Sequence, residues 1–274
     1  SGITINEWYN PRSVKKQLEA QLDLYPKYPD TLAWPSIMPR GWPELSMLGA
    51  KQKVGEFLPL PEPLIKSTGD LKRICVHDGL MPKYLNMFSF FQDQLKDRYE
   101  IIGGHSALPF DLAVLIRGTT QIMGDLYLNP ERVHQLLELC TEAVIYWLKS
   151  QYEVTGGSVR HVFLSGDFES LISPKHHKIF AVPYTKKVIK SLPPEVIPVY
   201  HNDANASHIV DHIPEVGAMA FHMGPGIGLG PDIGEVKDKI GKKVCLMGNI
   251  SPLEVLLRGS PKLVEEKCKK AISK

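Results

Sequence analysis

Short β-rich segments alternate with amphipathic segments along the second half of the chain, and this rhythm constrains the fold more than any other sequence feature. The β-rich segments are residues 99–107, 161–167, 196–203, 218–225 and 243–250. Helical patterns lie between several of them, over residues 174–192, 207–213 and 233–240. Strands that alternate with helices favour a parallel sheet covered by helices. We therefore expect an α/β fold, formed by a single domain over residues 1–274.

The N-terminal part is rich in proline and less regular, with a predicted helix over residues 11–24 and an apolar segment at 31–37. Further helices are predicted over residues 82–98, 109–117 and 130–155, the last two opened by proline, which is favoured at the first helical position. The pattern gives about six strands, whereas a (β/α)8 barrel has eight. We predict a TIM (β/α)8 barrel whose other strands lie outside residues 1–274 or in the irregular N-terminal part. An open doubly wound sheet is the competing architecture.

Composition excludes several classes of partner. Lys and Arg total 32 against 30 Asp and Glu, and the basic residues are scattered, so nucleic acid is not an expected partner. No apolar run of about 18 residues occurs, so no membrane span is expected. The four cysteines lie far apart in the sequence, without the paired spacing of a disulfide framework or a zinc ribbon. These features predict a cytoplasmic protein.

Polar side chains gather where the predicted strands end, and in both α/β architectures ligands bind at that edge. Because side chains alternate along a strand, His201 and Asp203 should point the same way, and we expect them to be catalytic. They could act as a general base and its orienting carboxylate. The expected substrate-binding residues are His105, Asp167, Glu169, His222 and Asn249. The structural alternatives are that Asp203 caps the next helix and that Asn249 fixes a loop.

A histidine pair near the start of the predicted helix at 174–192 is interpreted differently. His176 and His177 are flanked by Lys175 and Lys178, a pattern typical of a solvent-exposed helix face. We therefore expect no metal at this pair.

Three segments together resemble the uroporphyrinogen decarboxylase superfamily: residues 103–157, 166–189 and 248–272. This superfamily also contains cobalamin-dependent methyltransferases, and its fold is a TIM barrel, in agreement with the order of strands and helices. The resemblance extends in order over most of residues 90–274.

The sequence departs from true uroporphyrinogen decarboxylases at several positions. Ser36 stands where their catalytic aspartate is expected, and the segment that resembles PWTLASY has Leu115 in place of the tyrosine. No arginine-rich segment precedes Asp30, and Arg40 and Arg117 are the arginines expected near the rim. A tetrapyrrole with many carboxylates would call for more arginines than these. The resemblance therefore favours the methyltransferase branch.

The resemblance to the methyltransferases implies a site at residues 201–203. Their zinc motif is similar to His-x-Cys; His201 matches the histidine and Asp203 stands at the cysteine. A zinc ion would then take His201 and Asp203 with Glu169, Asp167 or His222 as a third ligand. The implied function is methyl transfer between a corrinoid, free or on a partner protein, and a small acceptor. A tetrapyrrole decarboxylase, acting for example on uroporphyrinogen, and a non-catalytic corrinoid- or tetrapyrrole-binding protein are the alternatives.

Overall fold

The computed structural model describes residues 42–51, 63–67, 70–71, 74–95, 103–224, 230 and 232–274, with isolated positions 12, 13, 15, 16, 19, 23 and 27. The apolar segment at 31–37, Ser36 and Arg40 lie outside the described residues, as does most of the predicted helix at 11–24. No helix within the described part of the chain is long and apolar enough to cross a bilayer.

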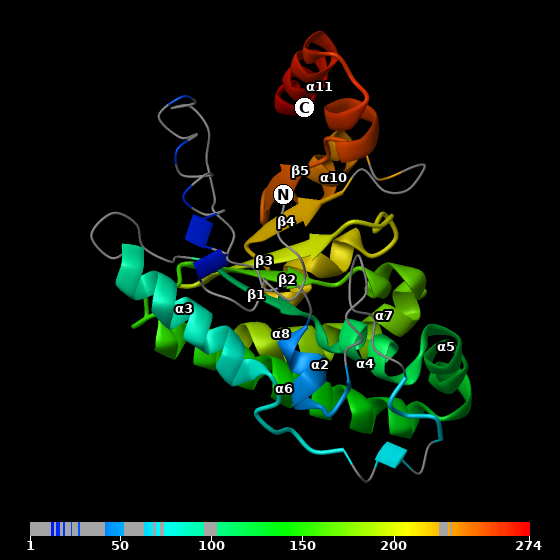
Figure 1. Cartoon of the computed structure of the whole chain (residues 1–274). Coiled ribbons are helices and arrows are strands. Elements are labelled where there is room, and N and C mark those ends of the chain that lie inside the picture. The colour runs from blue at the N-terminus through cyan, green and yellow to red at the C-terminus, as the bar shows by residue number, and fades with distance from the viewer. Residues whose placement is uncertain are drawn as a thin grey trace.

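Five parallel strands form one sheet in the order of the sequence (Figure 1). They are β1 (Gly103–Ala107), β2 (His161–Ser165), β3 (Ile197–Asn202), β4 (Ala220–Met223) and β5 (Cys245–Gly248). Parallel neighbours require a crossover between them, and helical segments supply each one. The five β-rich segments of the sequence therefore form strands in the predicted βα order.

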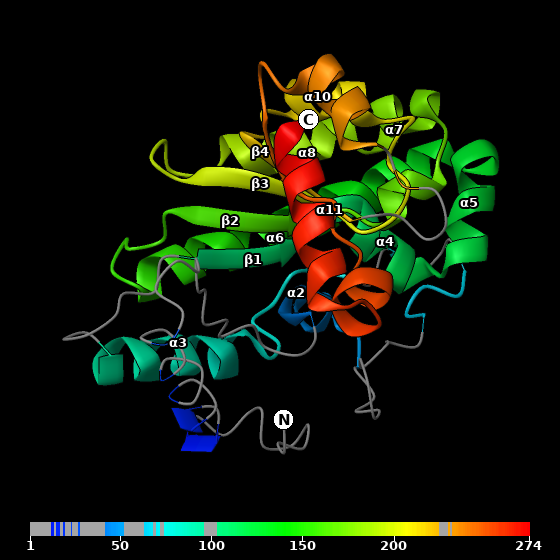
Figure 2. The same cartoon turned by 90° about the horizontal axis from the view of Figure 1, so that it is seen from above.

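The main helical layer packs against one face of this sheet. It contains α4 (Pro109–Arg117), α6 (Pro130–Val154) and α8 (Val182–Lys190). The other helices described are α2 (Pro43–Met47), α3 (Met81–Leu95), α5 (Thr119–Leu128), α7 (Pro174–Phe180), α9 (Ile213–Val216), α10 (Ile233–Ile240) and α11 (Pro261–Ser273). Short turns form η4 (Phe168–Leu171), η5 (Val210–His212) and the π-helix η6 (Pro252–Leu257). Seen from above, α4, α5 and α7 lie on the side to which the ends of β1 to β3 point (Figure 2).

Two predicted helices differ from the observed ones. The helix expected over residues 174–192 is broken at Ala181 into α7 and α8. Pro183 has no N–H to donate to the carbonyl of Ile179, and its ring would clash there, so one continuous helix cannot form. The helix expected over residues 207–213 is replaced by η5 and α9.

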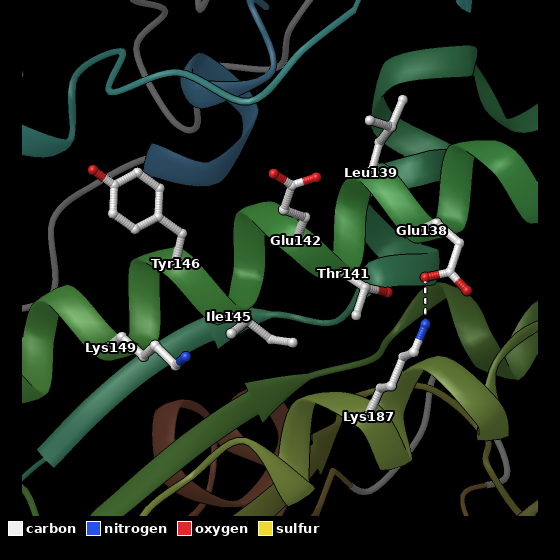
Figure 3. Close-up of a pocket in the computed structure, with 8 residues that line it drawn as sticks. All are labelled: Glu138, Leu139, Thr141, Glu142, Ile145, Tyr146, Lys149 and Lys187. Carbon is white, nitrogen blue, oxygen red and sulfur yellow. Dashed lines mark hydrogen bonds and ion pairs between the residues drawn. The ribbon is translucent and has the colours of Figure 1, made fainter.

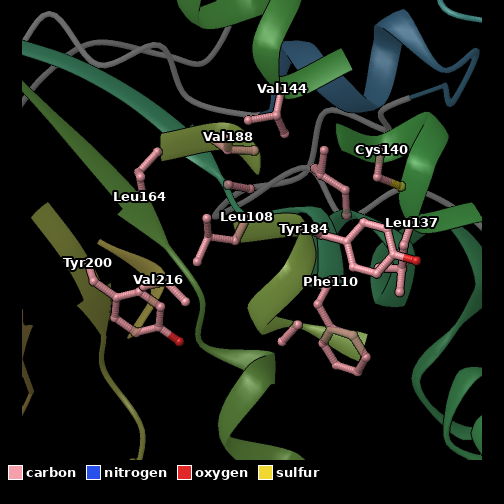
Figure 4. Packing of buried hydrophobic residues seen from close by; sticks show 14 of the residues in the cluster. Leu108, Phe110, Leu137, Cys140, Val144, Leu164, Tyr184, Val188, Tyr200 and Val216 are labelled. Carbon is pink, nitrogen blue, oxygen red and sulfur yellow. The ribbon is translucent and has the colours of Figure 1, made fainter. Parts of the chain in front are cut away.

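Alternation along the strands gives the sheet two unlike faces. Leu164 and Tyr200, from β2 and β3, point into the hydrophobic core with Leu108 and Val188 of the helical side (Figure 4). We call the opposite face the inner face. It carries the side chains between these core positions, including Phe163 and the histidines described below.

Strand β1 is at the edge of the described sheet, where backbone groups lack a neighbouring strand. The side chain of Gln151 on α6 takes the place of one peptide group. Its Oε1 accepts the His105 N–H at 3.1 Å and its Nε2 donates to the His105 carbonyl at 3.0 Å. Trp147 Nε1 also donates to that carbonyl, at 2.9 Å. Helix α6 therefore both covers the sheet and completes its edge.

Glu44 of α2 completes the same edge one step further along. Its Oε1 accepts hydrogen bonds from the Ser106 hydroxyl and, at 3.1 Å, from the Ala107 N–H. Its Oε2 is buried without a hydrogen-bond partner among the described residues. Burial raises the pKa of Glu44 from 4.5 to about 7, although these two donors act in the opposite direction. The carboxyl that fastens α2 to β1 therefore titrates near neutral pH.

The substitution Glu44→Gln should remove one component of the pH dependence of stability. As pH rises from 4.5 to about 7, folded Glu44 still holds a proton that the unfolded chain has released, so stability falls. A pKa shift of this size corresponds to about 3 kcal/mol. Urea unfolding of both proteins at pH 4.5, 6 and 8 should show their free-energy difference changing by about 3 kcal/mol. Parallel pH profiles would contradict this explanation.

Candidate active site

The structure brings His201 and Asp203 together at the C-terminal end of β3. His201 Nε2 lies 3.5 Å from Asp203 Oδ2, at the upper limit of a hydrogen bond. The His201 side chain is 17% exposed and the Asp203 side chain 70% exposed. Because so much of Asp203 is in water, the pair adds little to stability. The pair matters because Asp203 influences the protonation state of His201.

His222 joins this pair from the neighbouring strand. His201 and His222 are partners in the register of β3 and β4, so both rings lie on the inner face. Their Nδ1 atoms are 2.7 Å apart and their ring centroids 4.8 Å apart. Since two imidazole nitrogens at this distance must share one proton, one ring donates to the other. Asp203, His201 and His222 thus form a continuous chain.

The pKa values of Asp203, His201 and His222 are shifted in different directions. Burial lowers the pKa of His201, but the hydrogen bond and charge of Asp203, with the charge of Asp167, outweigh it and raise the pKa overall. Burial and the charge of His201 lower the pKa of His222. The hydrogen bond from His201 lowers the pKa of Asp203. When one proton is added to the two rings, His201 therefore holds it and donates Nδ1–H to His222.

His105 lies deeper on the inner face, with its Nε2 3.2 Å from Ser165 Oγ. Burial, followed by the charge of His201, lowers the pKa of His105 to about 4, so this ring is neutral at pH 7. The ring of Phe163 lies beside the other two histidines, with its centroid 5.7 Å from that of His222 and 6.4 Å from that of His201. The five strands contain neither lysine nor arginine. Imidazoles beside apolar groups therefore characterise the inner face.

Asp167 and Asn249 also lie at strand ends. Asp167 Oδ1 accepts the Asp203 N–H at 2.6 Å, which connects the loop after β2 to the end of β3. Asn249 follows β5 with a φ of 64°, a left-handed conformation that asparagine tolerates better than most residues. Its N–H donates to the Met223 carbonyl at 2.8 Å. The backbone of Asn249 thus ends the pairing of β5 with β4.

Glu169 does not join the other candidate residues. It is wholly buried on the helical side of the sheet, where Tyr200 OH donates to its Oε2 at 2.6 Å and His177 Nε2 lies 3.0 Å from the same oxygen. Tyr200 and His201 are adjacent on one strand and point to opposite faces. The predicted ligands His201, Asp203 and Glu169 are therefore not brought together. No cluster of three or more His, Cys, Asp or Glu side chains suited to a metal ion occurs among the described residues.

Two residues near the site were not predicted from the sequence. His177 was expected on an exposed helix face, but it is 1% exposed and stacks on His212 at 5.0 Å between ring centroids. Asp111 of α4 is also buried, and its Oδ1 accepts the Phe168 N–H at 3.2 Å. The neighbouring lysines led to the prediction of an exposed helix face, although His177 itself is buried. An aspartate among apolar residues, in PFDLAVLI, was the available signal for Asp111.

A groove of about 500 Å³ lies on the outer surface of α6 and α8, away from these residues (Figure 3). It is lined by Glu138, Leu139, Thr141, Glu142, Ile145, Tyr146, Lys149 and Lys187. An ion pair of 2.5 Å between Lys187 and Glu138 crosses it. The groove contains none of the candidate site residues, and the helical layer separates it from the inner face.

The fold and the site define an α/β protein with polar groups at the carboxyl ends of parallel strands, as in TIM barrels. The structure matches a solved methyltransferase from Methanosarcina mazei with a TM-score of 0.77 and 18% sequence identity. The match covers 96% of this chain and 77% of that chain. The prediction of an α/β TIM-barrel fold is confirmed.

The sequence model of the family described as uroporphyrinogen decarboxylase (URO-D) matches residues 44–274. The chain therefore belongs to the uroporphyrinogen decarboxylase family, and the resemblance seen in the sequence is confirmed.

Curated relatives carry two different activities in their names. A uroporphyrinogen decarboxylase from Chlorobaculum tepidum is 28% identical over 77% of this chain and 60% of its own length. A methylcobamide:CoM methyltransferase, MtbA, from Methanosarcina mazei is 24% identical over 84% of this chain and 67% of its own length. The chain spans about 60% of the length of the decarboxylases that it matches. The family therefore contains both decarboxylases and methyltransferases.

The dependence of His201 on Asp203 is directly testable. In Asp203→Asn, the hydrogen bond and charge that raise the pKa of His201 are lost while burial remains, so the pKa should fall. NMR titration of the imidazole signals, with His201 assigned from a His201→Gln variant, measures this change. Asp238→Asn, on the exposed side of α10, removes the same charge elsewhere and should leave the pKa unchanged. An unchanged His201 pKa in Asp203→Asn would refute the coupling.

Proposed function

We propose that this protein transfers a methyl group between a corrinoid and a small acceptor. The observation that carries the proposal is the chain from Asp203 through His201 to His222, on an inner face whose strands contain no lysine or arginine. Such a series of hydrogen-bonded groups can take a proton from an acceptor. The structural and sequence similarity to methyltransferases supports the same activity.

The charge of the described site suits a small acceptor better than a polyanion. A tetrapyrrole with several carboxylates needs convergent cations, and Arg117 was the one described arginine predicted to supply them. Its Nε donates to Asp125 Oδ2 at 2.7 Å and its Nη1 to the carbonyls of Ile65 and Lys66. Arg117 therefore ties α4 to neighbouring segments, which leaves imidazoles as the cationic groups described on the inner face.

The proton path follows from the order of the pKa values. His222 uses its Nδ1 for the bond to His201, and its Nε2 makes no hydrogen bond to another described residue, so we take Nε2 as the end of this series that meets the acceptor. An acceptor X–H gives its proton to His222 Nε2, while His222 Nδ1–H passes its proton to His201 Nδ1. The resulting imidazolium at His201 is stabilised by the carboxylate of Asp203, and His222 stays neutral. The deprotonated acceptor can then attack a methyl group.

A bound corrinoid would supply that methyl group, and we propose that it is held by a partner protein or binds free. Zinc activation of the acceptor is not supported by the described donor set. Of the three alternatives predicted for the third ligand, Glu169 is hydrogen bonded on the other side of the sheet, whereas Asp167 and His222 lie near His201 and Asp203. No cluster of three or more His, Cys, Asp or Glu side chains among the described residues is arranged to hold a metal ion. We therefore derive no step through zinc.

Tetrapyrrole decarboxylation is the second candidate, favoured by relatives that are named uroporphyrinogen decarboxylases. In that case the imidazoles of the inner face would bind substrate carboxylates. A non-catalytic protein that binds a corrinoid or tetrapyrrole is the third candidate. The three functions differ in what they do to methylcobalamin and uroporphyrinogen.

Mixing the protein with methylcobalamin and a panel of small thiols tests the proposal. Loss of the methylcobalamin absorbance with formation of a methyl thioether is expected. His201→Ala and His222→Ala should each lower the rate about 10²- to 10⁴-fold, because each interrupts proton transfer. His176→Ala is the matched control and should retain the rate, because His176 lies on α7 and is not one of the three hydrogen-bonded residues Asp203, His201 and His222.

Other outcomes select the alternatives. Conversion of uroporphyrinogen to coproporphyrinogen without dealkylation of methylcobalamin would establish the decarboxylase in its place. Binding of either compound without chemical change would favour the binding protein. Full methyl transfer by both His201→Ala and His222→Ala would refute the proposed proton path.

A further inference from the structure

The loop of residues 166–169, which follows β2 and includes the first two residues of η4, is held at its first residue by β3. The Gly166 N–H donates to the His201 carbonyl at 2.9 Å, and Asn202 Nδ2 donates to the Gly166 carbonyl at 2.6 Å. A Cβ at Gly166 would lie 2.8 Å from Leu108 Cδ1 and 3.0 Å from Tyr200 OH. The loop therefore runs in close contact with the core and cannot shift without breaking these bonds.

Asp111 holds the middle of the loop from α4. Its side chain is almost wholly buried, and its Oδ1 accepts the Phe168 N–H at 3.2 Å. Its Oδ2 is buried with no hydrogen-bond partner among the described residues. Burial, followed by the charges of Glu169 and Asp167, raises the pKa of Asp111 well above its ordinary value. The shift favours the protonated form of Asp111, and its Oδ1 is the acceptor for the loop backbone.

Glu169 holds the far end of the loop through groups on three elements. His177 Nε2 on α7 lies 3.0 Å from Oε2, Tyr200 OH on β3 donates to Oε2 at 2.6 Å, and Thr185 Oγ1 on α8 donates to Oε1 at 3.3 Å. The charge of Glu169 is thus compensated by hydrogen bonds in a fully buried position. None of these partners faces the inner face, so Glu169 does not contact a ligand there.

Asp167 lies between the bonds that hold Gly166 and the bond that holds Phe168, and it is the loop residue that contacts the end of β3 through the Asp203 N–H. Its Oδ1 accepts the Asp203 N–H at 2.6 Å, a short bond of an amide to a carboxylate. That bond fixes the backbone from which the Asp203 side chain extends toward His201. A shift of the loop would therefore move Asp203 relative to His201.

We propose that Asp111 and Glu169 are positioning residues, which hold the 166–169 loop from the helical side so that Asp167 keeps Asp203 beside His201. The inference concerns the same site as the proposed function, but its geometric part holds for any reaction there. Positioning of this kind affects rate because displacements of about 1 Å between reacting groups can cost about 100-fold.

The amide proton of Asp203 is the direct readout. In ¹⁵N-labelled protein its NMR signal should lie far downfield, owing to the short bond to Asp167. Asp111→Ala removes the acceptor of the Phe168 N–H, and Glu169→Gln removes one carboxylate oxygen that accepts hydrogen bonds. Both variants should move the Asp203 signal upfield. Asp111→Asn keeps an acceptor oxygen at the same position and should give the wild-type signal.

Val144→Ala is the matched control, since it removes buried methyl groups on α6 and leaves all of these hydrogen bonds in place. It should lower the melting temperature without moving the Asp203 signal. If Asp111→Ala does not fold, Glu169→Gln, which is nearly isosteric, decides the matter. An unmoved Asp203 signal in folded Glu169→Gln, or an equal shift in Val144→Ala, would overturn the proposal.

Kinetics provide the second readout. With methylcobalamin and a thiol, Asp111→Ala and Glu169→Gln should lower kcat about 10- to 100-fold with little change in KM, and Asp111→Asn should recover most of the loss. If the wild-type protein does not transfer a methyl group, the proposed function fails while the NMR experiment still tests the positioning. A wild-type kcat in both variants would contradict the positioning role.

Discussion

The alternation of side chains along β3 is the constraint on which the rest of the structure depends. Tyr200 and His201 are adjacent, yet the first points into the packed helical layer and the second to the inner face. The sheet thus separates a packed helical layer from the inner face that carries the candidate site residues. Contact between them runs through the backbone and through loops at the strand ends. Asp167 and Asp203 are connected at one such point.

The buried acidic groups on the helical side are stabilised in two different ways. Glu169 is surrounded by hydroxyl and imidazole groups, and burial raises the pKa of Tyr200, which keeps its hydroxyl protonated as a donor. Asp111 and Glu44 each have one buried oxygen with no hydrogen-bond partner in the described part of the structure, and for both of them burial raises the pKa. A buried carboxyl with few donors becomes stable by holding a proton. Both solutions fasten secondary-structure elements to the ends of strands.

The order of strands and the inner-face residues were predictable because period two and period 3.6 are local properties of the sequence. His201, Asp203 and His222 follow from that pattern, since residues at the ends of neighbouring parallel strands share an edge. Glu169 was misplaced because the turn after β2 carries it behind the sheet, and a turn of this kind has no periodicity. The partners of Glu169 come from β3, α7 and α8, which are distant in sequence. Packing in three dimensions decided its role.

The chain of three groups on the inner face also explains why its charges are arranged in one order. A carboxylate beside His222 would favour the proton on the ring whose Nε2 is available, and that ring would then be a poor base. With Asp203 beside His201 instead, the positive charge rests one ring away, and His222 can receive a proton at Nε2 while passing another inward. The electrostatic effect of Asp203 on His201 falls with the distance between them. This arrangement of charges therefore requires Asp203 to stay close to His201. The loop of residues 166–169 bears on the position of Asp203 at the inner face through its bond to the Asp203 N–H, although Asp111 and Glu169 lie on the other side of the sheet.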